Sequence, residues 1–311
     1  MIRRSLCFSL AACALLMGDQ NSLTGPVSGL VFDSRSHALR PIVGVPGAAY
    51  LGAAIASGLE WASVAPDGKT ALAVREGKLF VGSRLSGEAQ WIEVNGALSG
   101  INRAAWSAGS NGAAVFTAGN LQIVRISGET ASADAPIEAS FGDITALALD
   151  AEAKHILAGA ADGIYLLSAG APARRIAGVG SPSALLATPY GLLAADRAGN
   201  KIWEVVDIAG AAPLLLYADE TAGIASPSGL GLSADGRRLF VSNSESKTVD
   251  ILDFATHLPA GRVALDVSPT EFSPLTKSLA LVNSGPGDGE PLFVFDAANP
   301  AVYFVPAGRE Q

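Results

Sequence analysis

Short apolar runs separated by polar turns recur along most of this chain. The clearest unit reads Ser228-Gly-Leu-Gly-Leu-Ser-Ala-Asp-Gly-Arg-Arg-Leu-Phe-Val-Ser-Asn243, followed by an alternating strand at residues 248–253. An Asp-Gly pair between two apolar runs favours a β-hairpin, because both residues tolerate the backbone angles of a tight turn. Residues 61–81 repeat this arrangement around Asp67-Gly68. The pattern therefore predicts an all-β chain built from hairpins.

The hairpins recur with a period of about 40 residues, which is typical of β-propeller blades with four strands each. We label the strands of a blade A to D from the channel outward. The A strands are predicted at residues 59–65, 101–107, 144–150, 183–188, 228–233 and 270–275. The C strands are predicted at residues 79–81, 121–125, 163–167, 201–205, 248–252 and 291–295. Six antiparallel blades are therefore expected between Gly58 and Pro306.

Residues 29–43 form one more hairpin before the first complete blade. Gly29-Leu-Val-Phe-Asp33 is similar to Leu292-Phe-Val-Phe-Asp296, so we interpret this hairpin as strands C and D. It predicts a seventh blade position with one incomplete blade, and the alternative is a six-bladed ring with an added N-terminal hairpin. Residues 42–59 lack charge and are about as long as a membrane span. Their glycines and Pro46 favour a long D–A loop instead, so we expect no membrane span.

The first 18 residues have the order of a secretory signal peptide. Arg3 and Arg4 precede a short apolar run, and the sequence turns polar after Gly18. We expect export to the periplasm or the extracellular space, with residues 19–311 forming one propeller domain. The alternative is a lipid anchor on Cys13, because Leu10-Ala-Ala-Cys13 resembles a lipobox.

Composition narrows the function classes. The chain is 49% hydrophobic and 16% charged, which excludes disorder and suits sheets that are buried on both faces. The net charge is −8, with dispersed cations, so we expect no nucleic-acid partner. Cleavage after Gly18 would remove both cysteines and leave 19 cations against 29 anions, a net charge of −10. Thiol chemistry is then excluded.

Two blades carry a resemblance to known repeats. Residues 181–205 combine Ser-Pro-Ser, a Gly turn, an apolar run that ends in Asp196, and Gly-Asn before Lys-Ile-Trp203. This segment resembles the NHL repeat, and residues 226–253 are similar to both NHL and YVTN-type repeats. The resemblance implies a propeller but no single activity, since propellers support many functions.

The histidines do not suggest a catalytic centre. His37 and His257 are predicted in C–D turns and His155 in an A–B turn, away from the D–A and B–C loops that usually form the working face of a propeller. No nucleophile-elbow motif accompanies them. We therefore identify no catalytic residue.

Polar side chains near the starts of A strands and the ends of B strands are the candidate binding residues at the channel mouth. These are Glu60, Asn102, Arg103, Asp143, Asp196, Asn243, Glu271 and Asn283. Five of them carry oxygen ligands that suit a hard cation such as Ca²⁺: Glu60, Asn102, Asp143, Asn243 and Glu271. Gluconolactonase-like propellers hold a divalent ion with a Glu, Asn and Asp set, but this sequence lacks their motifs. The other interpretation is that these groups satisfy backbone atoms at strand ends.

Two functions follow. The leading prediction is a monomeric, non-catalytic binding or scaffold module that contacts a protein, peptide or glycan through its loop face, without a cofactor. The alternative is a metal-dependent, lactonase-like hydrolase or lyase, in which a divalent cation at the channel mouth polarises a carbonyl group. For either function, Phe80, Phe116, Ile164, Trp203, Ile251 and Phe293 are expected to be buried between blades.

Overall fold

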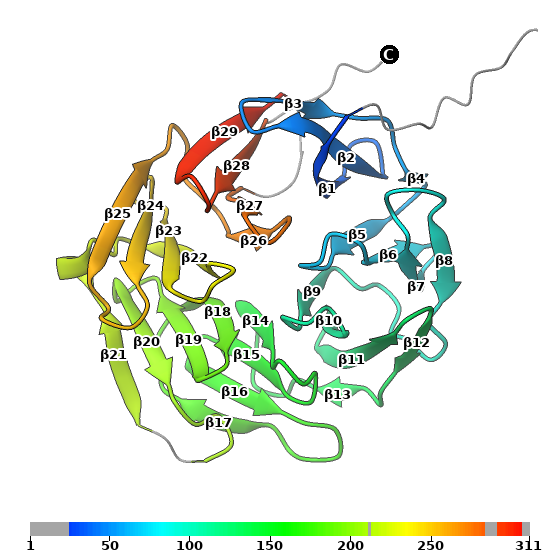
Figure 1. The fold of residues 1–311 in the computed structure, drawn as a ribbon. Coiled ribbons are helices and arrows are strands. Elements are labelled where there is room, and N and C mark those ends of the chain that lie inside the picture. Colours follow the sequence, from blue (N-terminus) through cyan, green and yellow to red (C-terminus); the bar gives the residue numbers. More distant parts are fainter. Residues whose placement is uncertain (1–24, 211–212, 284–290, 307–311) are drawn as a thin grey trace, which may run out of the picture.

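The computed structural model describes residues 25–210, 213–283 and 291–306. They form seven antiparallel sheets arranged around a central axis as the blades of a β-propeller (Figure 1). The all-β prediction and the seven blade positions are confirmed. The six-bladed alternative is wrong, because the N-terminal hairpin belongs to a blade of its own. Among the described residues, no helix is long and apolar enough to cross a membrane.

Blades 2 to 7 each have their strands in chain order from the channel outward. Blade 2 contains β5 (Trp61–Val64), β6 (Ala71–Arg75), β7 (Lys78–Ser83) and β8 (Gln90–Glu93). Blade 3 contains β9 (Arg103–Trp106), β10 (Gly112–Thr117), β11 (Asn120–Ser127), β12 (Thr130–Ala133) and the short β13 (Ile137–Glu138), which also pairs with β11. Blade 4 contains β14 (Ala146–Leu149), β15 (Ile156–Ala160), β16 (Gly163–Leu167) and β17 (Arg174–Ala177).

The last three blades follow the same order. Blade 5 contains β18 (Pro182–Thr188), β19 (Gly191–Asp196), β20 (Lys201–Val205) and β21 (Leu214–Ala218), and the 3₁₀ turn η1 (Glu220–Ala222) follows it. Blade 6 contains β22 (Pro227–Leu232), β23 (Arg238–Asn243), β24 (Thr248–Asp253) and β25 (Pro259–Ala264). Blade 7 contains β26 (Ser273–Pro274), β27 (Leu279–Leu281), β28 (Leu292–Asp296) and β29 (Ala301–Val305).

Aspartates define many of the turns between these strands. Asp67 Oδ1 accepts hydrogen bonds from the backbone N–H groups of Lys69 and Thr70, and Gly68 takes the positive φ of 67° that the turn requires. At the end of β24, Asp253 Oδ1 accepts from the N–H groups two and three residues later. Asp296 does the same at the end of β28. The apolar runs therefore end where an aspartate turns the chain.

Blade 1 is incomplete and differs from the sequence interpretation. It contains β1 (Val27–Asp33), β2 (Ala38–Val45), β3 (Ala48–Leu51) and β4 (Ala56–Ser57). Both β3 and β4 pair with the same edge of β2, so the blade is only three strands deep. The prediction of a long D–A loop over residues 42–59 is wrong, because much of this segment forms the outer strand of the blade.

The direction of β1 shows which strand is missing. In the turn after β1, His37 O accepts a hydrogen bond from Leu59 N, and His37 Nδ1 contacts Leu59 O, beside the start of β5. Other blades have their B–C turns on this face, as the bond between Glu60 and the β6–β7 turn shows. Strands β1 and β2 therefore correspond to B and C rather than to C and D. Among the described residues no strand lies inside β1, so strand A is the one that blade 1 lacks. Gly68 of blade 2 approaches Leu275 of blade 7.

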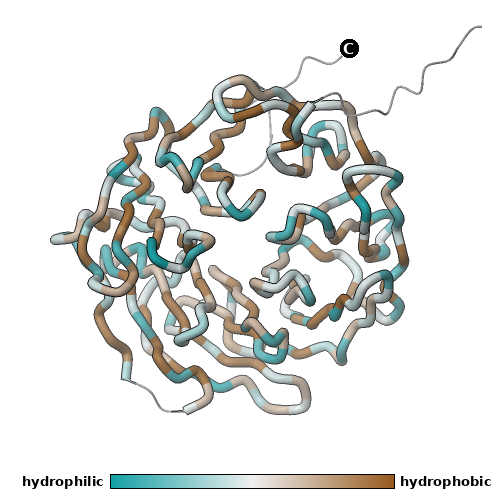
Figure 2. The backbone as a smooth tube through the Cα atoms, in the orientation of Figure 1, coloured by the Kyte–Doolittle hydropathy of each residue, from teal (hydrophilic) through white to brown (hydrophobic). Residues whose placement is uncertain are grey.

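Hydrophobic residues follow the strands and hydrophilic residues the turns (Figure 2). Of the six residues expected between blades, Ile164 and Ile251 are buried, whereas Phe80, Phe116, Trp203 and Phe293 are only partly buried. Close packing near the channel relies instead on small residues. A Cβ atom on Gly229 would lie 2.6 Å from the carbonyl carbon of Glu271 in the next blade. The Ser228 hydroxyl crosses the same seam and donates to Pro269 O.

Candidate functional site

The residues predicted to bind at the channel mouth lie on one face of the ring, but they take part in local contacts. Glu60 Oε1 accepts a hydrogen bond from Gly77 N at 2.9 Å within blade 2. Arg103 lies over the Phe116 ring, and its Nη1 donates to Ile144 O of blade 4 at 2.8 Å. The side chain of Arg103 therefore joins blades 3 and 4. Asn102 and Asp143 are exposed.

Three further candidates satisfy backbone or buried groups at the ends of B strands. Asp196 is buried and accepts from Gly199 N. Asn243 is fully buried; its Oδ1 accepts from Ala225 N, and its Nδ2 donates to Asp250 Oδ2 at 2.7 Å. Asn283 Oδ1 accepts from the N–H of Phe293 at 2.8 Å. These contacts support the structural interpretation of the polar strand ends.

Glu271 is the most distinctive carboxylate at the channel mouth. Burial raises the pKa of this side chain, although a hydrogen bond from Ser273 Oγ to Oε2, at 2.9 Å, acts in the opposite direction. A carboxylic acid that is held neutral more easily can donate a hydrogen bond as well as accept one. Glu271 alone, however, does not form a catalytic constellation.

The five proposed cation ligands belong to five different blades. Among the described residues, no three His, Asp or Glu side chains gather closely enough to hold a metal ion. Glu60, Asp143 and Glu271 therefore do not form a shared set of ligands. The part of the chain that the structure describes therefore brings no three acidic or histidine ligands together for the lactonase-like alternative.

The histidines are dispersed, as expected, but one lies on an unexpected face. His155 Nδ1 contacts Asp150 Oδ2 at 2.7 Å in an A–B turn of blade 4. His37 follows a B strand rather than a C strand, so its turn lies on the same face as the channel-mouth residues, opposite to the prediction. Its Nδ1 contacts Leu59 O at 3.1 Å. His257 lies in the C–D turn of blade 6, as predicted, and stacks on Tyr217 with ring centroids 3.9 Å apart.

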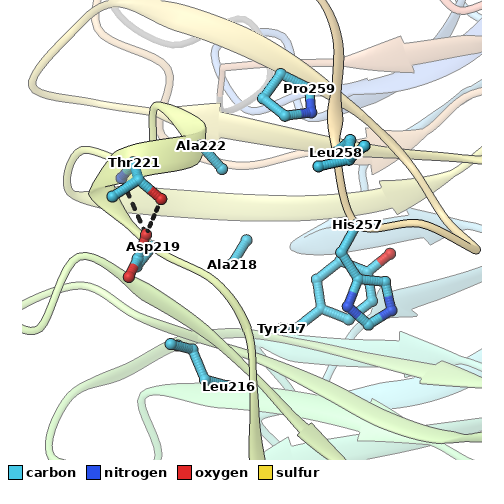
Figure 3. Close-up of a pocket in the computed structure, with 9 residues that line it drawn as sticks. All are labelled: Leu216, Tyr217, Ala218, Asp219, Thr221, Ala222, His257, Leu258 and Pro259. Carbon is cyan, nitrogen blue, oxygen red and sulfur yellow. Dashed lines mark hydrogen bonds between the residues drawn. The ribbon is translucent and has the colours of Figure 1, made fainter.

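A groove of about 310 Å³, which no sequence pattern indicated, lies at the outer seam between blades 5 and 6 (Figure 3). One wall comes from the end of β21 and from η1, and the other from the turn before β25. The residues that line it are Leu216, Tyr217, Ala218, Asp219, Thr221, Ala222, His257, Leu258 and Pro259. Most of these side chains are apolar, although polar atoms make up nearly half of the exposed lining.

An aromatic cluster forms the base of the groove. Tyr217 is buried, and its hydroxyl donates to Phe254 O at 3.1 Å across the seam. Burial raises the pKa of Tyr217, and the nearby carboxylates of Glu204 and Asp253 add to this effect, so the hydroxyl stays protonated and remains a donor. Phe254 also packs against the exposed Tyr190 ring. These contacts hold the two blades in a fixed arrangement.

A second set of contacts supports the walls of the groove at η1 and β25. Arg262 Nε and Asp250 Oδ1 form an ion pair at 2.5 Å, and Asp250 is buried. Gly223, which ends η1 with a φ of 94°, lies against the Arg262 guanidinium so closely that a Cβ atom would collide with it. A groove with fixed walls loses little conformational entropy when a ligand binds.

The rim of the groove carries one ionised carboxylate. Asp219 Oδ1 accepts from Thr221 Oγ1 at 2.7 Å and from Thr221 N at 2.9 Å, and these bonds lower the pKa of Asp219. The other oxygen, Oδ2, takes part in neither bond. The groove can therefore offer a negative charge beside an apolar wall.

Comparisons with known proteins support the fold only. No known protein family matches this sequence, and no curated protein matches it. Among solved structures, the chain resembles a functionally unknown protein from Desulfotomaculum acetoxidans DSM 771, with a TM-score of 0.60 and 13% sequence identity. The match covers 90% of this chain and 99% of that chain. The resemblance to NHL and YVTN repeats stays a prediction.

Proposed function

We propose that this chain is an exported, non-catalytic binding module that holds an apolar segment of a partner protein in the groove between blades 5 and 6. The observation that carries this proposal is the exposed apolar surface at the groove. The side chain of Leu216 is 48% exposed and that of Leu258 is 64% exposed, on opposite walls. Exposed apolar side chains around a concave surface are typical of interaction sites.

The chemistry of the lining favours a protein or peptide over a glycan. A glycan presents many hydroxyl groups, and each must find a polar partner when it leaves water. Among the described residues that line the groove, the polar side chains are Asp219, Thr221, His257 and Tyr217. Thr221 is already bonded to Asp219, and the Tyr217 hydroxyl is already bonded to Phe254 O. An apolar peptide side chain loses no hydrogen bond on entering such a groove.

The proposal moves the contact surface from the loop face to the outer seam. At the channel mouth the candidate residues Glu60, Arg103, Asn243 and Asn283 are engaged in hydrogen bonds within the ring. Changing their partners to bind a ligand would cost those bonds. At the seam between blades 5 and 6, a bound ligand would only displace water from the exposed leucines.

Site-specific photo-crosslinking in the source cells tests this placement. A photoreactive phenylalanine analogue at Leu216 or Leu258 is expected to give one discrete adduct with a partner protein. The same analogue at Phe304, which is exposed on an outer strand of blade 7, serves as the control and is expected to give none. Adducts from Arg103 or Asp143 without any from the groove positions would place the function at the channel mouth and contradict the proposal.

Export is a separate part of the proposal and depends on residues 1–18, which lie outside the described residues. The mass of the intact protein recovered from its native compartment tests it. A chain that begins at residue 19 is the expected result. A lipid-modified chain that begins at Cys13 would support the anchored alternative, and an unprocessed chain in the cytoplasm would contradict export.

A further inference from the structure

The outer strands of the blades differ in how they protect their free edges. An edge strand exposes unpaired N–H and C=O groups, and proteins usually block it with charges, proline or bulges. Strand β17 carries Arg174 and Arg175, and β25 begins with Pro259 and carries Arg262. Strands β3 and β29 contact each other across the seam between blades 7 and 1.

Strand β21 has a β-bulge at Tyr217 but lacks the other protections. Its sequence is Leu-Leu-Leu-Tyr-Ala, with no charge and no proline, and it is the last strand of its sheet. Leu215 and Leu216 are 43% and 48% exposed. Two exposed leucines on an uncharged edge promote unwanted pairing with another chain unless a bound ligand covers them.

The same strand forms one wall of the groove. Leu216, Tyr217 and Ala218 all line it, and Asp219 follows directly at the end of the strand. A chain paired with the free edge of β21 would therefore run beside the groove and reach the Asp219 carboxylate. Backbone pairing supplies affinity in such strand addition, and pockets for alternate side chains supply specificity.

We infer that the partner segment adds as a fifth strand to the free edge of β21, with apolar side chains against Leu216 and Leu258 and a lysine or arginine at Asp219. This inference rests on the proposed function and specifies the ligand as an extended peptide of alternating apolar and cationic residues. We assign a positive charge to the ligand because Asp219 Oδ2 takes part in neither of the bonds to Thr221 and can contact a cationic side chain. The net charge of −8 on the chain favours the same partner at long range.

Two N-methylated peptides test the strand pairing directly. The probe is the capped peptide Val-Lys-Val-Lys-Val, labelled for fluorescence anisotropy with the full chain. Only one alternating set of its N–H groups faces β21, so N-methylation of that set should weaken binding by about tenfold or more, since each lost hydrogen bond is worth roughly 1 kcal/mol. N-methylation of the other set should change binding by less than about twofold, because those groups face water.

Hydrogen exchange of the bound chain provides a second readout. Slower exchange confined to residues 214–218 is expected when the peptide binds. Equal binding by both methylated peptides, or slower exchange elsewhere only, would overturn strand addition while leaving a side-chain docking function in place. No binding of the unmodified peptide would overturn the inference as well, whereas the crosslinking result decides the proposed function on its own.

Variants with matched controls test the two anchors. L216K places a charge on the edge and should abolish binding, whereas F304K makes the same change on β29 and should not. D219N keeps a capping side chain for η1 but removes the charge, so it should weaken the lysine peptide several-fold and leave Val-Gln-Val-Gln-Val unchanged. D235N, in an exposed turn of blade 6, is its control. A dimer that L216K converts to a monomer would identify a second copy of the chain as the occupant and overturn the inference.

Discussion

At the scale of single residues, polar side chains near the channel serve the fold. Asn243 illustrates this, because its amide is fully buried and bonds both to the backbone of the preceding loop and to Asp250. A sequence places such residues at strand ends, where ligands are often bound, but it does not show the backbone groups that they satisfy. The fold could be predicted from the sequence. The structural role of these residues was one of two interpretations, and the sequence alone could not decide between them.

Glu271 provides a test at this scale. Burial raises the pKa of Glu271, so the folded chain binds its proton more tightly than the unfolded chain does. The stability that this proton provides is present below the ordinary pKa of 4.5 and is lost as the pH rises through the folded value. E271Q should therefore raise the melting temperature at pH 7.5 and have little effect near pH 4.

The exposed Glu60 is the matched control, because E60Q keeps an oxygen that can accept from Gly77 N. E60Q should change the melting temperature at pH 7.5 by less than E271Q does. A melting temperature of E271Q that is lower than that of the unmodified protein at pH 7.5 would show that the charged carboxylate has a favourable partner.

At the scale of elements, the hairpins and the period were predictable because turns and apolar runs are local. Blade 1 was not, since Gly29-Leu-Val-Phe-Asp33 has the sequence of a C strand and the position of a B strand. The contact between His37 and Leu59 in the folded chain shows its direction. The groove between blades 5 and 6 could not be predicted either. Its two walls, β21 and the β24–β25 turn, are distant in the sequence and come together only in the folded ring.

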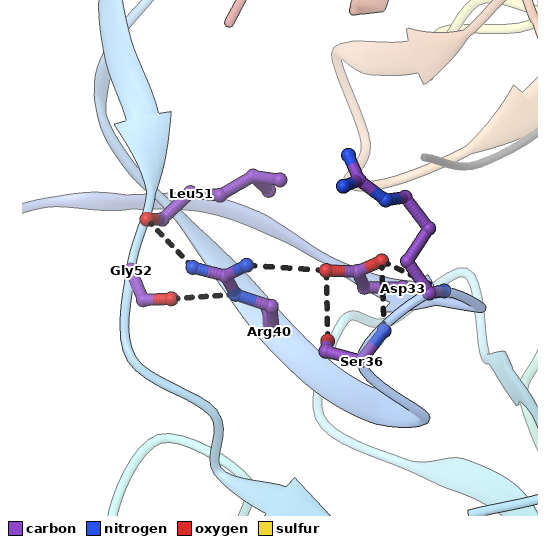
Figure 4. A network of polar contacts seen from close by, with 6 residues as sticks. Asp33, Ser36, Arg40, Leu51 and Gly52 are labelled. Atoms are coloured by element: carbon purple, nitrogen blue, oxygen red, sulfur yellow. Dashed lines mark hydrogen bonds and ion pairs between the residues drawn. The ribbon is translucent and has the colours of Figure 1, made fainter. Parts of the chain in front are cut away.

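An ion pair between the buried Asp33 and the partly exposed Arg40 joins the parts of blade 1 (Figure 4). Arg40 Nη1 contacts Asp33 Oδ2 at 3.1 Å, and Arg40 also donates to the carbonyl oxygens of Leu51 and Gly52. Burial alone would raise the pKa of Asp33, but hydrogen bonds from Ser36 and Arg40 outweigh it, and the pKa is lowered. The pair therefore stabilises the blade above the ordinary pKa of 3.8, and that stability is lost as the pH falls.

D33N should destabilise the protein by roughly 3 kcal/mol at pH 7, because it leaves the Arg40 charge without its partner. Urea unfolding measures this loss, and the difference from the unmodified protein should shrink below pH 4. D134N breaks the more exposed pair with Arg125 and should cost less than about 1 kcal/mol. Equal losses in the two variants would show that the blade 1 pair has no special role.

Packing between blades gives a further prediction. G229A places a methyl group against Glu271 and Phe272 of the next blade and should cost about 1–3 kcal/mol in unfolding free energy. G180A is the matched control, because nothing lies within 4 Å of the added Cβ atom there, and it should change stability by less than about 0.5 kcal/mol. If G229A leaves the unfolding free energy unchanged, the seam between blades 6 and 7 is packed less closely than these distances indicate.

At the scale of the whole molecule, the ring is a rigid support with unequal edges. Each described blade comes from one continuous segment, so blades 7 and 1 meet without sharing a strand. Most outer strands are protected by charge, by proline or by contact with a neighbour, whereas β21 has neither charge nor proline and lies beside the groove. The function is accordingly proposed at the seam of blades 5 and 6, where one strand edge, two exposed leucines and one carboxylate lie together.

Hydrogen exchange of the chain in complex with the partner captured by crosslinking is the most direct measurement of this claim. The account predicts slower exchange in residues 214–222 and 254–259, with the channel mouth unchanged. Protection confined to residues 102–103, 143 and 271 would contradict it and return the binding surface to the loop face.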